Sequence, residues 1–202
     1  MNVPSRLQAE YFLKEAASHN PGPWVSHARN VAQAAEIIAR ATQALDVEAA
    51  YVMGLLHDIG RQEDSSGMRH ILEGYRFLHQ QGYEDAARIC LTHSFPIKDP
   101  HAGADDWDGQ EEEFQFIQDY LQSIDYNHYD YLIQLCDAVC LPEGFCLLEK
   151  RMVDVVLRHG FNEYTLPRWN AFFAVQRKIE KLIDESVYRL LPGVIETTFG
   201  WL

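Results

Sequence analysis

Four polar side chains of this 202-residue chain lie on otherwise apolar helix faces, and their types are those that bind divalent cations. They are His27, His57, His93 and Asp137. Each has apolar residues three, four or seven positions away, as Asp137 has Ile133, so a period of about 3.6 residues turns each polar group inward. A buried carboxylate without a partner is costly, whereas a cation shared with several imidazoles would stabilise it. We therefore expect these side chains to converge on a metal site.

The adjacent pair His57-Asp58 sharpens this expectation. Consecutive helical residues point about 100° apart, so both can bind one ion only if it lies in the wedge between them. We expect Gly54, which precedes the pair, to let a neighbouring helix approach closely. We expect Gly60, which follows the pair, to let the chain turn away.

The segment Gly54–Arg61, which reads GLLHDIGR, resembles the signature of the HD superfamily of metal-dependent phosphohydrolases in its HDIG form. The family order is a histidine, a His-Asp pair, one or two further histidines and a distal aspartate. Here that order is matched by His27, His57-Asp58, His70, His93 and Asp137. The surrounding segments WVSHARNVA (24–32), HILEG (70–74), ICLTH (89–93) and LIQLCDA (132–138) also resemble the family, so the similarity covers about residues 24–141.

The resemblance implies a first divalent ion held by His27, His57, Asp58 and Asp137. His70 and His93 match the additional ligands of members with two metals, so we favour two ions with Asp58 as the bridge. The pattern does not distinguish Fe, Mn, Zn, Mg, Ni or Co. The chain departs from HD-GYP relatives in the short spacing from Asp58 to His70 and in having Ser94 after His93, and His101 in the following loop could replace the missing imidazole.

The expected reaction follows from the ions and from one basic residue. A metal-bound water loses its proton near neutral pH and supplies a hydroxide nucleophile. Arg61, directly after the signature, could bind a phosphate with two hydrogen bonds and stabilise developing charge, so Asp58 and Arg61 are the candidate catalytic residues. We expect hydrolysis of a phosphoester or phosphoanhydride in a nucleotide or another small phosphorylated substrate.

Other interpretations of the same residues stay open. Some proteins with a similar fold and ligand set are mixed-valent di-iron oxygenases, and metal identity is what would separate the two. The chain could also be a catalytically inactive sensor that binds a nucleotide or a metal. A buried network of ion pairs and hydrogen bonds is the non-catalytic explanation of the aspartates, and Arg61 could simply be a surface residue near a helix C-terminus.

Helical periodicity dominates the chain and no strand-like alternation is evident, which predicts an all-α HD-domain bundle. The expected organisation is an N-terminal helix in residues 1–23 that packs on the domain, an HD core in 24–141 and C-terminal helices in 142–202 that complete the bundle. The expected helices cover about 5–18, 24–45, 46–57, 69–80, 83–93, 111–123, 129–141, 147–159 and 165–188, with loops at 62–67 and 94–110.

Composition restricts the partners. The 17 basic and 30 acidic side chains give a net charge of −13, which argues against a nucleic-acid polymer but not against a small phosphorylated substrate. No apolar run is long enough to span a membrane, so we expect a cytoplasmic protein, and the C-terminal helices could form a homodimer surface. The four cysteines are expected to be buried thiols, and His19, His79, His128 and His159 to be surface or packing residues. The acidic loop 99–113 is either solvated or a lid, with Trp107 as its cover.

Overall fold

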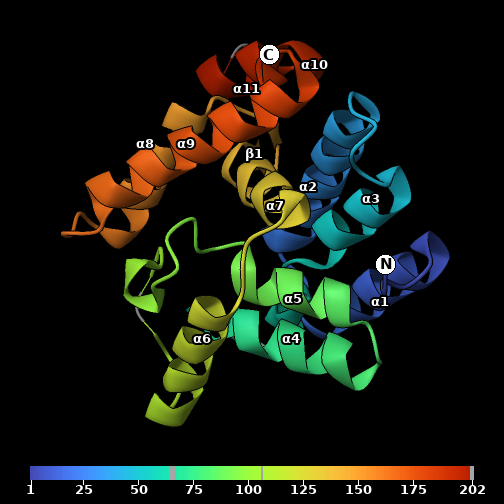
Figure 1. The fold of residues 1–202 in the computed structure, drawn as a ribbon, viewed down its shortest axis with the longest axis vertical. Coiled ribbons are helices and arrows are strands. Elements are labelled where there is room, and N and C mark those ends of the chain that lie inside the picture. The colour runs from blue at the N-terminus through green and yellow to red at the C-terminus, as the bar shows by residue number, and fades with distance from the viewer. Residues whose placement is uncertain (64–66, 106, 201–202) are drawn as a thin grey trace.

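Helices form almost all the regular structure in the computed structural model, which describes residues 1–63, 67–105 and 107–200 (Figure 1). In chain order they are α1 (Arg6–His19), α2 (Pro23–Arg40), α3 (Val47–Leu56), the 3₁₀ helix η1 (Ile59–Glu63), α4 (His70–Gln80), α5 (Glu84–Thr92), the 3₁₀ helix η2 (Pro100–Ala102), α6 (Glu111–Ser123), α7 (His128–Ala138), α8 (Leu148–His159), α9 (Thr165–Ile183), α10 (Val187–Leu190) and α11 (Val194–Phe199). The predicted all-helical bundle is confirmed.

One short hairpin interrupts the helical pattern. Strands β1 (Cys140–Leu141) and β2 (Gly144–Phe145) pair antiparallel, so the expectation of a chain without strands is wrong at this point. Each strand has only two residues, which is too short for the sequence to show alternation. The hairpin follows α7 directly and brings the chain round to α8.

Local sequence explains why α2 and α3 lie so close together. Asp46 caps α3, because its side chain accepts a hydrogen bond from the Ala49 backbone N–H at 2.8 Å. A Cβ atom at Gly54 would lie 2.8 Å from the Ala32 Cα atom of α2, so only glycine permits this crossing. The predicted role of Gly54 is confirmed, and it sets the positions of His27 on α2 and of the end of α3.

Gly60 has a different role from the one predicted. Its backbone has no positive φ. A Cβ atom there would lie 2.0 Å from the His70 carbonyl oxygen and 2.4 Å from the Gly74 backbone nitrogen. Gly60 is therefore needed for the close packing of η1 against α4, and not for a turn of the chain.

Helix α7 lies at the centre of the molecule (Figure 1). It packs against α2 and α3 on one side, against α5, and against α8 and α9 of the C-terminal part. One apolar core joins α2, α3 and α7 to the C-terminal helices. A second contains residues from each of the helices α1, α2, α3, α4 and α5, and a third lies under α6. The three cores fix α2, α3, α5 and α7 relative to one another, and these helices carry most of the candidate ligands.

Several predicted boundaries differ from the structure. Helix α2 ends at Arg40 and not near 45, because the Thr42 hydroxyl accepts a hydrogen bond from the Ala44 N–H and favours a turn. Helix α9 ends at Ile183 and not near 188, because Asp184 adopts the left-handed conformation with φ 54°. Helix α7 ends at Ala138, before the hairpin. Part of the expected 62–67 loop, residues 64–66, lies outside the described residues.

The expectations for the cysteines and for membrane-spanning segments can also be compared with the structure. All four cysteines are buried free thiols, as predicted. Among the described residues, no helix combines the length and the apolar character that crossing a membrane would require.

Candidate metal centre

Five segments bring the six candidate ligands together. His27 lies in α2, and His57 and Asp58 follow the last residue of α3. His70 begins α4, His93 follows α5, and Asp137 lies near the end of α7. The first five of these residues are at most 7% exposed, whereas the Asp137 side chain is 20% exposed. The predicted convergence of histidines and aspartates is therefore what the structure contains.

Backbone carbonyl groups fix the orientation of three imidazoles. The Nδ1 atom of His57 lies 2.7 Å from the Gly54 oxygen, and that of His70 lies 2.7 Å from the Gly67 oxygen. The Nδ1 atom of His93 is 3.1 Å from the oxygen of Ile89, one helical turn earlier. A carbonyl oxygen only accepts, so Nδ1 donates in each case and the neutral ring keeps a lone pair on Nε2. This is the arrangement in which histidine binds a metal ion through Nε2.

The Nε2 atoms of the histidines lie close to carboxylate oxygens. The Oδ1 atom of Asp58 lies 3.1 Å from His70 Nε2 and 3.5 Å from His93 Nε2. On the other side, Asp137 Oδ1 lies 2.8 Å from His27 Nε2 and 3.9 Å from His57 Nε2. The Nε2 lone pairs of His70 and His93 therefore face the Asp58 carboxylate, and that of His57 faces Asp137, an arrangement that a cation between them would stabilise.

Two groups of three residues have the spacing of a metal site, and they share one carboxylate. The first group is His27, His57 and Asp58, and the second is Asp58, His70 and His93. Within each group the candidate ligand atoms lie within 4.8 Å of one another. His57 Nε2 and Asp58 Oδ1 are buried and make no hydrogen bond within the described residues. The residues therefore fit divalent ions, and Asp58 belongs to both groups.

Electrostatics favours the ionisation states that such a site needs. Burial lowers the pKa of His57 to about 4, so this imidazole is neutral near pH 7. Burial alone would raise the pKa of Asp58, but the Arg61 guanidinium and nearby imidazoles outweigh it and hold that pKa well below its usual value. The pKa of Asp137 is likewise lowered, because the hydrogen bond with His27 outweighs the effect of burial. Both carboxylates are therefore ionised where imidazole lone pairs converge.

Arg61 lies directly on the second group. Its Nε donates to Asp58 Oδ2 at 2.7 Å, and its Nη2 lies 3.3 Å from His70 Nε2. Burial and this positive charge together lower the pKa of His70. The Asn20 side chain donates to the Arg61 carbonyl oxygen at 2.6 Å and fixes the backbone. The Arg61 guanidinium thus already compensates part of the Asp58 charge.

The comparisons with known proteins agree with this geometry. The family model of the HD domain matches residues 24–141, which is more than half of the chain. The chain belongs to the HD-domain family. A search of the curated proteins and one of the solved structures found no match to it. HD domains are mostly metal-dependent hydrolases, and the buried His and Asp groups can hold metal ions.

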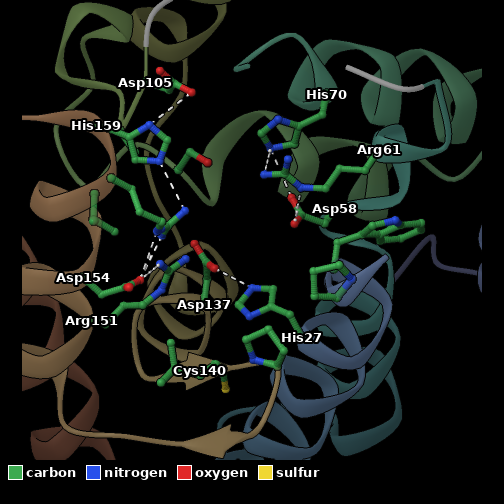
Figure 2. A pocket seen from close by; sticks show the side chains of 18 of the residues that line it. His27, Asp58, Arg61, His70, Asp105, Asp137, Cys140, Arg151, Asp154 and His159 are labelled. Atoms are coloured by element: carbon green, nitrogen blue, oxygen red, sulfur yellow. Dashed lines mark hydrogen bonds and ion pairs between the residues drawn. The ribbon is translucent and has the colours of Figure 1, made fainter. Parts of the chain in front are cut away.

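The cluster opens into a cavity of about 660 Å³ in this HD-domain protein (Figure 2). His27, Asp58, Arg61 and His70 form one side of the cavity. The other side is formed by α8, which contributes five polar or charged residues that were not predicted to border the ligands: Lys150, Arg151, Asp154, Arg158 and His159. Their spacing on one helix face could have indicated a common surface, but nothing in the sequence showed that this surface faces the ligands.

His159 is exposed, as expected, but it also borders the cavity, whereas His101 does not line it. His159, expected at the surface or in packing, lines the cavity and lies 3.2 Å from the Asp105 carboxylate. His101, expected as a substitute ligand, pairs with Asp99 at 2.9 Å and contacts the Phe114 ring, so that suggestion is wrong. The reason is the 3₁₀ turn η2, whose N-terminal cap is Asp99.

The acidic loop covers the cavity in part, but not through its tryptophan. Ala104 and Asp105 line the cavity. Trp107 does not; its ring NH donates to the Gln110 carbonyl oxygen at 3.0 Å and its ring packs against Phe114. Arg168 of α9 donates to the Gly103 carbonyl oxygen and holds the loop against the C-terminal helices. Asp106, which belongs to the same acidic run, lies outside the described residues.

Proposed function

We propose that this HD-domain protein hydrolyses a phosphoester or phosphoanhydride bond in a nucleotide or another small phosphorylated molecule, using two divalent ions. The observation that carries the proposal is the pair of His/Asp groups that share Asp58 and open into the cavity. Two ions about 3.5–4 Å apart that share a carboxylate are typical of phosphoryl-transfer enzymes. The proposal assigns His27, His57, Asp58 and Asp137 to one ion, and Asp58, His70 and His93 to the other.

The protein's own contribution begins with orientation. The backbone carbonyls that accept from His57, His70 and His93 hold the Nε2 atoms toward the centre of the cluster. When bound, divalent ions supply Lewis acidity and lower the pKa of water, which makes a hydrolytic nucleophile available near neutral pH. Burial lowers the pKa of His57 and of His70, so protons compete less for the lone pairs of these two rings.

Arg61 gives the site a charge for the phosphoryl group. It lines the cavity, and its carboxylate partner Asp58 is also a ligand in the proposal. A guanidinium beside the reacting phosphoryl group stabilises negative charge that develops on the oxygens during transfer. Arg61 is therefore proposed as a catalytic residue that binds phosphate rather than metal.

The size of the cavity agrees with a small substrate. A volume of about 660 Å³ lies within the usual range for sites that bind nucleotides and molecules of similar size. The net charge of −13 argues against a long polyanion as the substrate. The substrate class we propose is thus a phosphorylated small molecule and not a nucleic-acid polymer.

A direct test is to load the protein with Mn²⁺, Fe²⁺, Zn²⁺, Mg²⁺, Ni²⁺ or Co²⁺ and measure phosphate release from nucleotides and phosphomonoesters. We expect turnover with at least one ion and one substrate class, and loss of turnover after chelation. Absence of phosphate release from every compound, with ions bound, would contradict the proposal. A mixed-valent iron EPR signal with oxygen consumption would instead indicate an oxygenase, and tight nucleotide binding without product would indicate a sensor.

A further inference from the structure

The face of α8 that borders the cavity carries an ordered set of charges. Arg151, Asp154 and Arg158 are spaced i, i+3 and i+7, so they lie on one side of the helix, and all three line the cavity. Figure 2 shows Arg151 and Asp154 across the cavity from Arg61, with Asp137 on the same side as Arg151. The family match ends at residue 141, so α8 lies outside the region that it covers.

One carboxylate oxygen is shared between two guanidinium groups on this face. Asp154 Oδ2 accepts from Arg151 Nη1 at 3.1 Å and from Arg158 Nε and Nη2 at 3.2 and 3.0 Å. One negative charge between two positive charges leaves a net positive charge, to which Lys150 adds. The Nε atom of Arg151 is buried and donates to no acceptor within the described residues. A buried donor without an acceptor is costly, so the face is suited to an incoming anion.

Further contacts hold Arg158 in place. Its Nη1 atom lies 3.3 Å from His159 Nε2, and His159 Nδ1 lies 3.2 Å from Asp105 Oδ2 (Figure 2). Glu143 of the hairpin also lines the cavity, but no ion pair joins it to α8 in the described part of the chain. Asp154 and the Asp105–His159 pair therefore orient the Arg151 and Arg158 guanidinium groups before any ligand binds. This lowers the entropy cost of binding an anion.

We propose that this face of α8 binds a second anionic group of the substrate while the phosphoryl group lies at the metal cluster. The placement of the phosphoryl group rests on the proposed function. Arg151 and Arg158 are about 10.5 Å apart along the helix axis, and either guanidinium can form paired hydrogen bonds with a phosphate or a carboxylate. The substrate class is accordingly a phosphorylated molecule with another phosphate or carboxylate a few bonds away, and not the phosphomonoester of a neutral alcohol.

Three phosphonates with the same three-carbon chain test this assignment, since their P–C bonds resist hydrolysis. Propylphosphonate has one anionic end, 3-phosphonopropionate adds a carboxylate, and propane-1,3-diphosphonate adds a second phosphonate. Their dissociation constants are measured by calorimetric titration of the Mn²⁺-loaded protein. We expect 3-phosphonopropionate, propane-1,3-diphosphonate or both to bind about tenfold more tightly than propylphosphonate. The tighter of the two shows whether α8 prefers a carboxylate or a phosphate as the second anionic group.

Arg158→Gln separates binding at α8 from chelation of the ions by the second group. The expected result is that the tenfold gain falls to about twofold or less in this variant. Arg189→Gln is a matched control, because Arg189 also pairs with an acid four residues earlier in the sequence but lies on α10 and does not line the cavity. In the control the gain is expected to stay, and metal content measured on each variant shows that the cluster is intact.

The outcomes separate this inference from the proposed function. If no ligand gains affinity from a second anionic group, or if Arg158→Gln keeps the full gain, the inference is wrong even where phosphate release is observed. If the gain depends on Arg158 and no compound is hydrolysed, the anion site stands and the proposed reaction fails.

Discussion

Two buried aspartates in this molecule have opposite surroundings. Asp130 of α7 is 0% exposed and Asp58 is 4% exposed. Asp130 accepts hydrogen bonds from donors only: Arg88 Nη2 at 2.6 Å, the Thr92 hydroxyl at 2.8 Å and the Asn127 N–H at 2.8 Å. Asp58 has Arg61 on one oxygen, while the other faces imidazole nitrogens and makes no hydrogen bond.

Burial alone therefore does not indicate a functional carboxylate. Donors saturate Asp130, and its ion pair with Arg88 joins α7 to α5. One oxygen of Asp58 faces the Nε2 atoms of His70 and His93, an arrangement that a bound cation would complete. The two sites are also connected, because Thr92 directly precedes His93. The hydrogen bonds around Asp130 therefore help to position His93 of the metal cluster.

The largest expected effect is that of Asp58→Asn, which keeps the shape of the side chain and removes its charge. Both proposed ions lose a shared ligand, so we expect metal content to fall at both groups and phosphate release to drop by about 10³-fold or more. Metal analysis and steady-state assays measure these effects, and a cooperative thermal transition of the metal-free variant checks that it folds. Retention of two ions by this variant would remove Asp58 from the role of bridge.

Asp130→Asn should show the reverse pattern. It breaks the buried pair with Arg88, and we expect the free energy of unfolding to fall by about 3 kcal/mol, because the guanidinium loses its counter-charge. Urea denaturation of the metal-free protein measures this loss. The folded variant is expected to keep its metal ions, so an unchanged stability together with lost metal would contradict the distinction between the two aspartates.

Arg61→Gln tests whether the cation beside Asp58 acts on the substrate or holds the site together. We expect phosphate release to fall by about 10²-fold, since a charge that stabilises the transferring group is lost. Metal content is expected not to fall, because Arg61 competes with cations for Asp58 and contributes no metal ligand. A variant that loses its ions and its activity together would show that Arg61 is structural.

The smallest effect is expected for Thr92→Val, which removes one donor from Asp130 and conserves shape. Asp130 keeps its bonds to Arg88 and Asn127, so the loss of unfolding free energy should be about 1.5 kcal/mol. Denaturant titration measures it, with metal content as a second readout. A loss as large as that of Asp130→Asn would mean that the pair with Arg88 contributes little.

The sequence indicates the ligands well because their signal is local. Each inward-facing histidine or aspartate has apolar neighbours at helical spacing, and the His57-Asp58 pair fixes the order of the set. The contact at Gly54 was also predictable, because a glycine before the pair serves close helix packing.

The other wall of the cavity could not be predicted in the same way. Arg151 and Arg158 belong to a helix whose distance from the ligands depends on how α7, α8 and α9 pack, and local periodicity does not contain that information. The end of α9 at Asp184 was missed for a related reason, since no glycine or proline there indicates a left-handed residue.

We propose that two cations share Asp58, and anomalous scattering from crystals of the metal-loaded protein measures this without relying on activity. We expect two anomalous peaks on either side of the Asp58 carboxylate, one bonded to His27 and His57 and the other to His70 and His93. Crystals of protein with bound metal in which no peak, or only one, lies among these side chains would contradict it.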